Sequence, residues 1–222
     1  AASDVYKRQV DLPEEIAGAD PVPAPVRVER MAAAAIAEAL AAAGMTEGAF
    51  DGPLMLGMPP VEMEWPQRVA LARRARGNGH AALSVASIGQ RDLYETFLYG
   101  GVGERLALRF GTKGAPIAIT TACATGASAI QLGVEAIQRG EAKSVIALGT
   151  DGSVQPEAVI RFSLLSALSS RNEEPTKASR PFEKSRDGFV MSEGAAALIL
   201  EDLEHARARG ATIIGLVSGC GE

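Results

Sequence analysis

The sequence predicts an α/β protein, and three observations support this fold class. Hydrophobic residues make up 47% of the 222 residues, which is enough to bury a core. Segments typical of strands and helices alternate between residues 117 and 217, as they do in strand–helix–strand units. The 24 glycines and the 5% share of aromatic residues favour close packing of backbones.

The first part of the chain predicts a linker, a helix and a short strand. Residues 13–25 contain four prolines, which are typical of a linker. Residues 27–43 favour a helix by propensity, and Gly44 stands where a capping glycine belongs. Residues 53–58 form a short apolar run that indicates a strand and ends before Pro59.

Two further helices are predicted, at residues 65–76 and 92–110, the second with a glycine interruption. The first carries four arginines, which indicate either a basic docking patch or a solvated helix face: Arg68, Arg73, Arg74 and Arg76. The glycines near residue 100 do not form a dinucleotide-binding fingerprint, because no strand precedes them and no acidic residue follows at the required distance.

The middle of the chain predicts a strand at residues 117–121, a helix at 124–139 and a strand at 144–148. Apolar residues recur at helical spacing in the helix. The two strands should be parallel, with a right-handed connection. A polar loop at residues 169–187 precedes two more strands and a short charged helix between them, at residues 194–200, 211–217 and 202–209.

Composition excludes several classes of function. The chain has 22 Lys plus Arg against 27 Asp plus Glu, so nothing indicates a nucleic-acid partner. No stretch reaches the roughly 18 apolar residues that a membrane span needs. Cys123 and Cys220 offer no disulfide framework, and they fit the reducing cytoplasm. No Cys or His pair has metal-ligand spacing, so neither a metal nor a cofactor is expected.

Cys123 is the strongest candidate for catalysis. It stands at a predicted strand-to-helix junction, where unpaired N–H groups and the helix dipole favour a thiolate. Its small neighbours Ala122, Ala124 and Gly126 leave room for a substrate. Position alone supports an inert buried cysteine equally well.

A nucleophile normally needs a base, and the two histidines are poor candidates for one. His80 follows a glycine-rich loop, and His205 lies on the short charged helix near Arg209. Both are interpreted as structural or surface groups. Cys220 stands in a glycine-rich turn and is interpreted as a small filler rather than a second nucleophile.

Three segments carry a family resemblance: TTACATGASAIQLGVEAIQRGEA, ALSSRN and KASRPFEKSRDGFVMSEGAAALILEDLEHARARGA. Together they resemble the β-ketoacyl-acyl carrier protein synthases, and most closely the elongating type II condensing enzymes of bacterial fatty acid synthesis. The match runs from about Gly111 to Val217. It implies a thiolase-like fold, with a mixed sheet between helices, of which this chain would hold most of the first of two similar halves.

The resemblance also implies a mechanism and partners. Cys123 matches the acyl-accepting cysteine and would carry the acyl group. Malonyl carrier protein would then lose CO2, and the resulting carbanion would attack the acyl group on Cys123. The Cys123 N–H would supply one oxyanion-hole donor. Phe162 and Phe189 match positions that line the acyl channel, with ordinary core packing as the alternative. The expected partners are acyl carrier protein with its acyl and malonyl groups, and a second copy paired through residues 116–121.

The sequence departs from the family pattern in several places. In the family, two histidines and a lysine assist decarboxylation. None of these three residues has a matching position in this sequence. Only Arg27 and Arg30 remain of a basic carrier-docking patch, and residues 55–61 replace a glycine-rich strand exit, so chain-length preference cannot be carried over. Two other readings stay open: a non-catalytic chain-length partner subunit, and a cysteine hydrolase.

Both ends of the chain look unusual. Residues 1–9 are interpreted as a cloning or sequencing scar, because residues 4–9 match an adaptor end codon by codon; a natural polar tail is the alternative. Residues 10–222 would then be an N-terminal ketoacyl synthase domain truncated at both ends. By itself such a piece is expected to be inactive and poorly folded.

Overall fold

The computed structural model describes residues 22–65, 68 and 96–221. Within them, four strands form one sheet in the order β2-β1-β3-β4: β1 (Leu54–Gly57), β2 (Ile117–Ile119), β3 (Ser144–Asp151) and β4 (Gly194–Glu201). β1 pairs in parallel with β2 and β3, whereas β4 pairs antiparallel with β3. The sheet is therefore mixed, and the predicted α/β class is confirmed.

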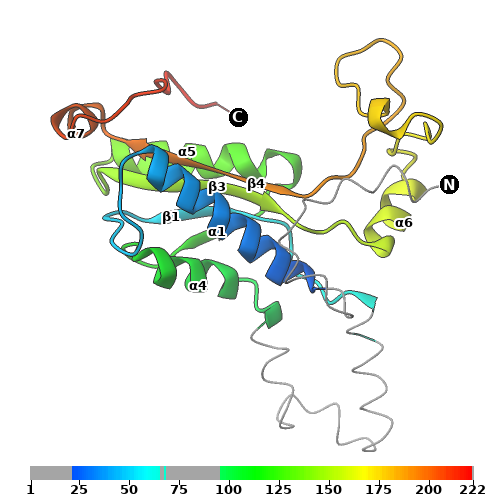
Figure 1. Cartoon of the computed structure of the whole chain (residues 1–222), viewed down its shortest axis with the longest axis horizontal. Helices are drawn as coiled ribbons and strands as arrows, with labels where there is room; N and C mark the ends of the chain where they lie inside the picture. The colour runs from blue at the N-terminus through cyan, green and yellow to red at the C-terminus, as the bar shows by residue number, and fades with distance from the viewer. Residues whose placement is uncertain (1–21, 66–67, 69–95, 222) are drawn as a thin grey trace, which may run out of the picture.

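Helices cover both faces of the sheet (Figure 1). α1 (Ala24–Ala42) and α4 (Gly101–Phe110) lie on one face, and α5 (Thr125–Gln138) lies on the other. Alternation along β1 explains the division, because successive side chains point to opposite faces. Leu54 and Leu56 join the core cluster that contains Ile36 of α1, whereas Met55 joins the cluster that contains Ala129 of α5.

α1 follows the predicted helix at residues 27–43 closely, and it begins three residues earlier, at Ala24. A proline in the first turn suits this start, because the first turn needs no N–H donor. The buried positions Val28, Ile36 and Leu40 recur at multiples of four. Gly44 ends the helix in the left-handed conformation, with φ of 68°, as predicted.

α5 confirms the predicted helix at residues 124–139, but small side chains form its buried face. Ala129, Gly133 and Ala136 are buried, and they follow helical spacing. A Cβ on Gly133 would lie 2.8 Å from the Leu200 side chain and 3.1 Å from that of Val145. The small residues thus let the helix backbone lie directly on β3 and β4.

The predicted parallel strands at residues 117–121 and 144–148 are confirmed as β2 and β3, and β1 lies between them. The predicted strand at residues 211–217 is wrong, because this segment forms no strand in the described chain. Ile214 is 91% exposed, and the segment runs past α7 (Leu203–Ala208) without joining the sheet (Figure 1). A strand needs a neighbour for its backbone groups, and residues 211–217 have none there.

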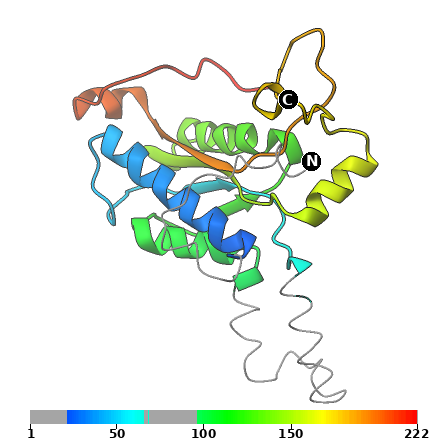
Figure 2. The ribbon, with the colours of Figure 1, turned by 45° about the vertical axis from the view of Figure 1, so that its right-hand side comes forward.

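α6 (Pro156–Leu164) and the loop after it lie beyond the carboxyl end of β3 (Figure 2). That loop contains the short 3-10 helix η4 (Pro175–Lys177) and is otherwise irregular, as predicted for residues 169–187. Three predicted segments lie wholly or partly outside the described residues: most of the helix at residues 65–76, the first residues of the helix at 92–110, and residues 13–21 of the proline-rich linker.

Candidate active site

A cavity of about 1050 Å³ lies at the carboxyl ends of the parallel strands β1, β2 and β3. This edge is where open α/β sheets ordinarily bind ligands. The cavity is also lined by the first turn of α1, by α6 and by the start of β4. Cys123, Phe162 and Phe189 all line it, so the fold brings together the three residues singled out in the sequence.

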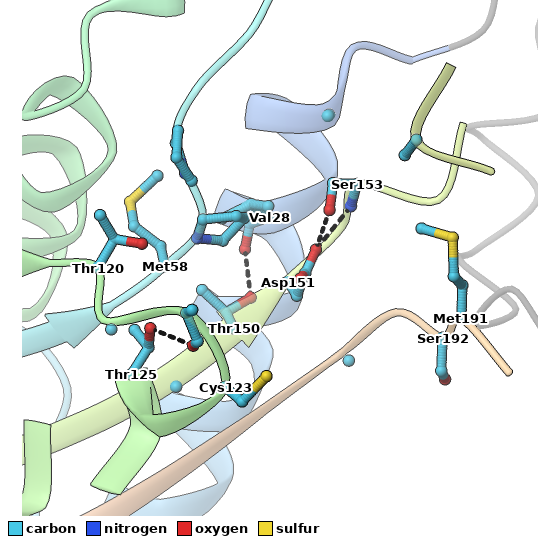
Figure 3. A pocket seen from close by; sticks show the side chains of 18 of the residues that line it. Val28, Met58, Thr120, Cys123, Thr125, Thr150, Asp151, Ser153, Met191 and Ser192 are labelled. Atoms are coloured by element: carbon cyan, nitrogen blue, oxygen red, sulfur yellow. Dashed lines mark hydrogen bonds between the residues drawn. The ribbon is translucent and has the colours of Figure 1, made fainter. Parts of the chain in front are cut away.

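Cys123 lies in η3 (Ala122–Ala124), the single 3-10 turn that joins the end of β2 to α5. Its thiol is free and exposed, and it lies on the cavity side of this turn (Figure 3). Among the described residues, Cys123 is therefore not the buried cysteine that its position in the sequence also allowed. Ala122, immediately before it, has φ of 51°, a conformation that is uncommon for residues other than glycine.

Two glycines let the start of α5 approach the ends of the strands. A Cβ on Gly57, at the end of β1, would lie 2.8 Å from the carbonyl oxygen of Thr125 and 2.9 Å from its methyl group. A Cβ on Gly149 in β3 would lie 3.4 Å from the Cα of Gly126. The turn that carries Cys123 is thus held against the sheet by backbone contact.

Phe162 and Phe189 form an edge-to-face aromatic pair, with ring centroids 5.1 Å apart. Phe162 comes from α6, whereas Phe189 pairs with Leu168 in an isolated parallel bridge. Gly188 makes the bridge possible, because a Cβ there would lie 2.4 Å from the Leu168 carbonyl carbon. The backbone therefore sets the position of the Phe189 ring.

Asp187 anchors the same bridge. Its carboxylate accepts hydrogen bonds from the Ser169 hydroxyl over 2.8 Å and from the Ser170 amide over 3.1 Å, and it pairs with Arg171 over 3.4 Å. The Ser169 hydrogen bond is the largest of the effects that hold the pKa of Asp187 below its ordinary value. Asp187 thus stays ionised and ties the two segments of the bridge together.

Arg27 forms a buried ion network behind the cavity wall. Its guanidinium pairs with Glu64 over 3.0 Å and with Glu193 over 3.2 Å, and it donates to the Gly152 carbonyl over 2.7 Å. Glu193 also accepts from the Val154 amide over 3.1 Å. Burial raises the pKa of Glu193, although Arg27 and the Val154 amide oppose that effect. With 12% of its side chain exposed, Arg27 is not a docking group.

His205 lies far from the chemistry predicted for Cys123. Its Nδ1 is 3.0 Å from a carboxylate oxygen of Glu201, and the residue lines a second cavity, of about 760 Å³, near the start of β3. Glu201 also pairs with Arg209, and this hydrogen bond lowers the pKa of Glu201. His205 is therefore a half-buried group held by Glu201, in agreement with the structural or surface role that the sequence indicated. His80 lies outside the described residues.

The described residues contain neither a membrane-spanning helix nor a cluster of metal ligands. None of their helices has the length and apolar composition to cross a bilayer. Nor do their His, Cys, Asp and Glu side chains gather in groups of three or more that could hold a metal ion.

The sequence did not reveal the ion network around Arg27 or the hydrogen bonds of the Thr125 hydroxyl. Arg27 and Glu193 are separated by 166 positions, so no local pattern could link them. Thr125 bonds within one turn, to Thr121 and Ala122. The signal for it was a threonine near the start of a helix, a place where hydroxyls often bond to backbone.

Comparisons with known proteins agree on one family. The family model "Beta-ketoacyl synthase, N-terminal domain" matches residues 19–206. The 3-oxoacyl-(acyl-carrier-protein) synthase 2 of Coxiella burnetii is 40% identical over 137 residues, which are 60% of this chain and 33% of that protein. A β-ketoacyl synthase structure from Burkholderia phymatum has a TM-score of 0.67 at 30% identity, over 93% of this chain and 48% of its own.

A second structure extends this similarity. It contains a type II PKS acyl-carrier protein in complex with its ketosynthase, which is bound to the hexaketide. It has a TM-score of 0.58 at 29% identity and covers 75% of this chain and 40% of its own. These ketosynthase structures support the predicted thiolase-like fold class. The chain spans half or less of the length of each of these relatives.

Proposed function

Because the chain belongs to the β-ketoacyl synthase family, we propose that Cys123 is the acyl-accepting nucleophile of a condensing enzyme of fatty acid elongation. One observation carries the proposal: the exposed thiol of Cys123 lies in a large cavity at the carboxyl edge of the parallel strands. An acyltransferase nucleophile needs such access to a thioester.

The first half-reaction transfers the acyl group to Cys123. The thiolate attacks the thioester carbonyl, and a bond forms between Sγ and the carbonyl carbon. The bond between that carbon and the carrier sulfur then breaks, and the carrier thiolate leaves and takes up a proton. The negative charge of the tetrahedral intermediate falls on the carbonyl oxygen, to which the Cys123 N–H would donate a hydrogen bond. The product is an acyl thioester on Cys123.

The second half-reaction forms the carbon–carbon bond. Malonyl carrier protein releases CO2, and the electron pair of the broken bond attacks the carbonyl carbon of acyl-Cys123. The Cys123 thiolate then leaves, and the 3-oxoacyl group remains on the carrier. None of the histidines or lysines in the 222-residue sequence matches the groups that assist decarboxylation in the family. In this mechanism, those groups come from outside the 222 residues.

Phe162 and Phe189 contact the acyl chain in this proposal. Both rings line the cavity with Cys123, and Phe162 and Phe189 are 37% and 44% exposed. A hydrocarbon chain would cover that apolar surface, which contributes roughly 25 cal/mol per Å² removed from water. This exposure supports a binding role over ordinary core packing.

Acyl carrier protein is the proposed partner, and the related ketosynthase bound to its acyl-carrier protein supports that choice. We also propose a homodimer paired through β2, an edge strand whose Ile117 is 44% exposed, because such edges invite pairing. Light scattering of the full-length protein at micromolar concentration tests this, and a monomer would contradict it. The unpaired cysteines support a cytoplasmic location, and the domain limits 10–222 stay a prediction.

The experiment that tests the function is labelling of the full-length protein with an acyl thioester. The expected result is a stable acyl group on Cys123, found by peptide mass spectrometry, and elongation when malonyl carrier protein is added. Rapid hydrolysis of the acyl group would favour a cysteine hydrolase. No acylation at all would favour a non-catalytic chain-length partner, although such partners usually lack the cysteine.

A further inference from the structure

The hydroxyl of Thr125 spans the turn that carries Cys123. Its Oγ1 accepts a hydrogen bond from the Thr121 amide over 2.8 Å. It also donates one to the Ala122 carbonyl over 2.6 Å (Figure 3). These two backbone groups lie immediately before Cys123 in the chain. One side chain therefore ties together both residues that lead into the cysteine.

The turn has a backbone conformation that needs such support. Ala122 has φ of 51°, in the left-handed region that residues with a Cβ rarely adopt. Strained residues of this kind persist only where the surrounding structure holds them. Since Cys123 follows directly, any rotation at Ala122 would redirect the Cys123 side chain.

The rest of Thr125 is anchored to the sheet. Its methyl group and carbonyl oxygen lie within 3 Å of the Cβ position at Gly57, at the end of β1. The residue is half-buried and lines the cavity. The methyl side of Thr125 thus contacts the sheet, while the hydroxyl side holds the turn.

We propose that Thr125 is a positioning residue: its hydroxyl transmits the fixed position of β1 to Ala122 and so orients the thiol of Cys123 into the cavity. The proposal rests on Cys123 being the acyl acceptor, and it assigns Thr125 a task that acts through the backbone leading into Cys123. Misplacing a reacting group by about 1 Å can slow a reaction by roughly 100-fold.

The test compares three variants of the full-length protein. Thr125→Val keeps the shape and the methyl contact with Gly57 but removes the hydroxyl, whereas Thr125→Ser keeps the hydroxyl and removes the methyl. Ser128→Ala is the matched control, because Ser128 bonds to Thr121 Oγ1 and the Ala124 carbonyl but not to the Ala122 backbone. Unfolding temperatures are measured for all of them.

The first readout is the rate at which iodoacetamide alkylates Cys123, followed across pH and compared with Cys220, the other exposed thiol. The second is the single-turnover acylation of Cys123 by an acyl thioester. We expect Thr125→Val to slow acylation roughly tenfold or more with unchanged half-saturation, and to alter the alkylation profile of Cys123 alone. Thr125→Ser and Ser128→Ala should match the wild type.

Two outcomes would overturn the proposal. One is a Thr125→Val protein that matches the wild type in both readouts. The other is a Thr125→Ser protein that is slower than Thr125→Val, which would assign the effect to the methyl contact. If the wild type itself accepts no acyl group, the proposed function fails, while the alkylation profiles still test the role of Thr125.

Discussion

The Nε of Arg27 donates a hydrogen bond to a carboxylate oxygen of Glu193 over 3.3 Å, joining the first turn of α1 to the residue before β4. Only 12% and 2% of the two side chains are exposed. Both residues stand beside cavity-lining positions, Arg27 before Val28 and Glu193 between Ser192 and Gly194. This buried pair therefore holds two walls of the cavity together.

Replacing Arg27 by methionine should destabilise the protein by about 3–5 kcal/mol, because it leaves Glu64 and Glu193 buried without a counter-charge. Urea unfolding followed by circular dichroism measures the change. Adding Glu193→Gln to this variant should recover part of the loss by removing one of the two charges. Arg30→Met, at an exposed position of the same helix, is the control and should change stability by less than about 0.5 kcal/mol. A neutral Arg27→Met would contradict the role of the network.

Glu193 should make stability fall as pH rises. Burial raises its folded pKa above the ordinary value of 4.5, so the folded state binds its proton more tightly than the unfolded state. Between these two pKa values the folded state holds more protons, and stability decreases with rising pH. The difference in unfolding free energy between wild type and Glu193→Gln should therefore fall as pH rises from 4.5.

The contribution of Asp187 to stability should change with pH in the opposite direction to that of Glu193. Its folded pKa is lowered from 3.8, so its contribution to stability is present above that pH and is lost as pH falls through the folded pKa. The difference between wild type and Asp187→Asn should therefore shrink on acidification. Equal slopes for the two variants would show that the pKa directions are wrong.

Gly57→Ala should destabilise the protein and disturb Cys123. The new methyl group would lie 2.8 Å from the carbonyl oxygen of Thr125, so the start of α5 must move away from β1. We expect a loss of about 1–3 kcal/mol and slower alkylation of Cys123. Gly100→Ala is the control, because nothing lies within 4 Å of its Cβ position. Equal stability and reactivity in the two variants would rule out the backbone contact as the anchor of the turn.

Cys123→Ala should abolish acylation and condensation while leaving malonyl decarboxylation, which the proposed mechanism assigns to other groups. Acyl labelling and CO2 release from malonyl carrier protein measure the two activities separately. Cys220→Ala should retain both, because Cys220 lies in the exposed C-terminal segment. Normal elongation by Cys123→Ala would show that Cys123 is not the nucleophile.

Phe162 and Phe189 should be energetically coupled. A double-mutant cycle with alanine at each position should give a coupling energy of about 0.5–1.5 kcal/mol, as edge-to-face aromatic pairs do. Phe182, which is 98% exposed, serves as the control and should show no coupling to Phe162. Assays with acyl groups of different lengths should show a changed preference in both single variants if the rings contact the acyl chain.

The sequence by itself determined the α/β class, the helices at α1 and α5, and Cys123 as the candidate nucleophile. These features depend on local patterns: helical spacing of apolar residues, a capping glycine at Gly44, and a cysteine between a strand and a helix. The same local logic wrongly predicted a strand at residues 211–217, because an apolar run does not reveal whether a neighbouring strand exists to pair with it.

Only the tertiary structure decided which residues meet around Cys123. Glu193 reaches Arg27 across 166 positions, and Gly57 contacts Thr125 because β1 lies beside β2 in the sheet. Strand order and helix docking follow from packing the whole core, so no segment read alone contains them. The sequence therefore identified the candidate nucleophile, Cys123. Only the folded chain showed which residues hold it in position.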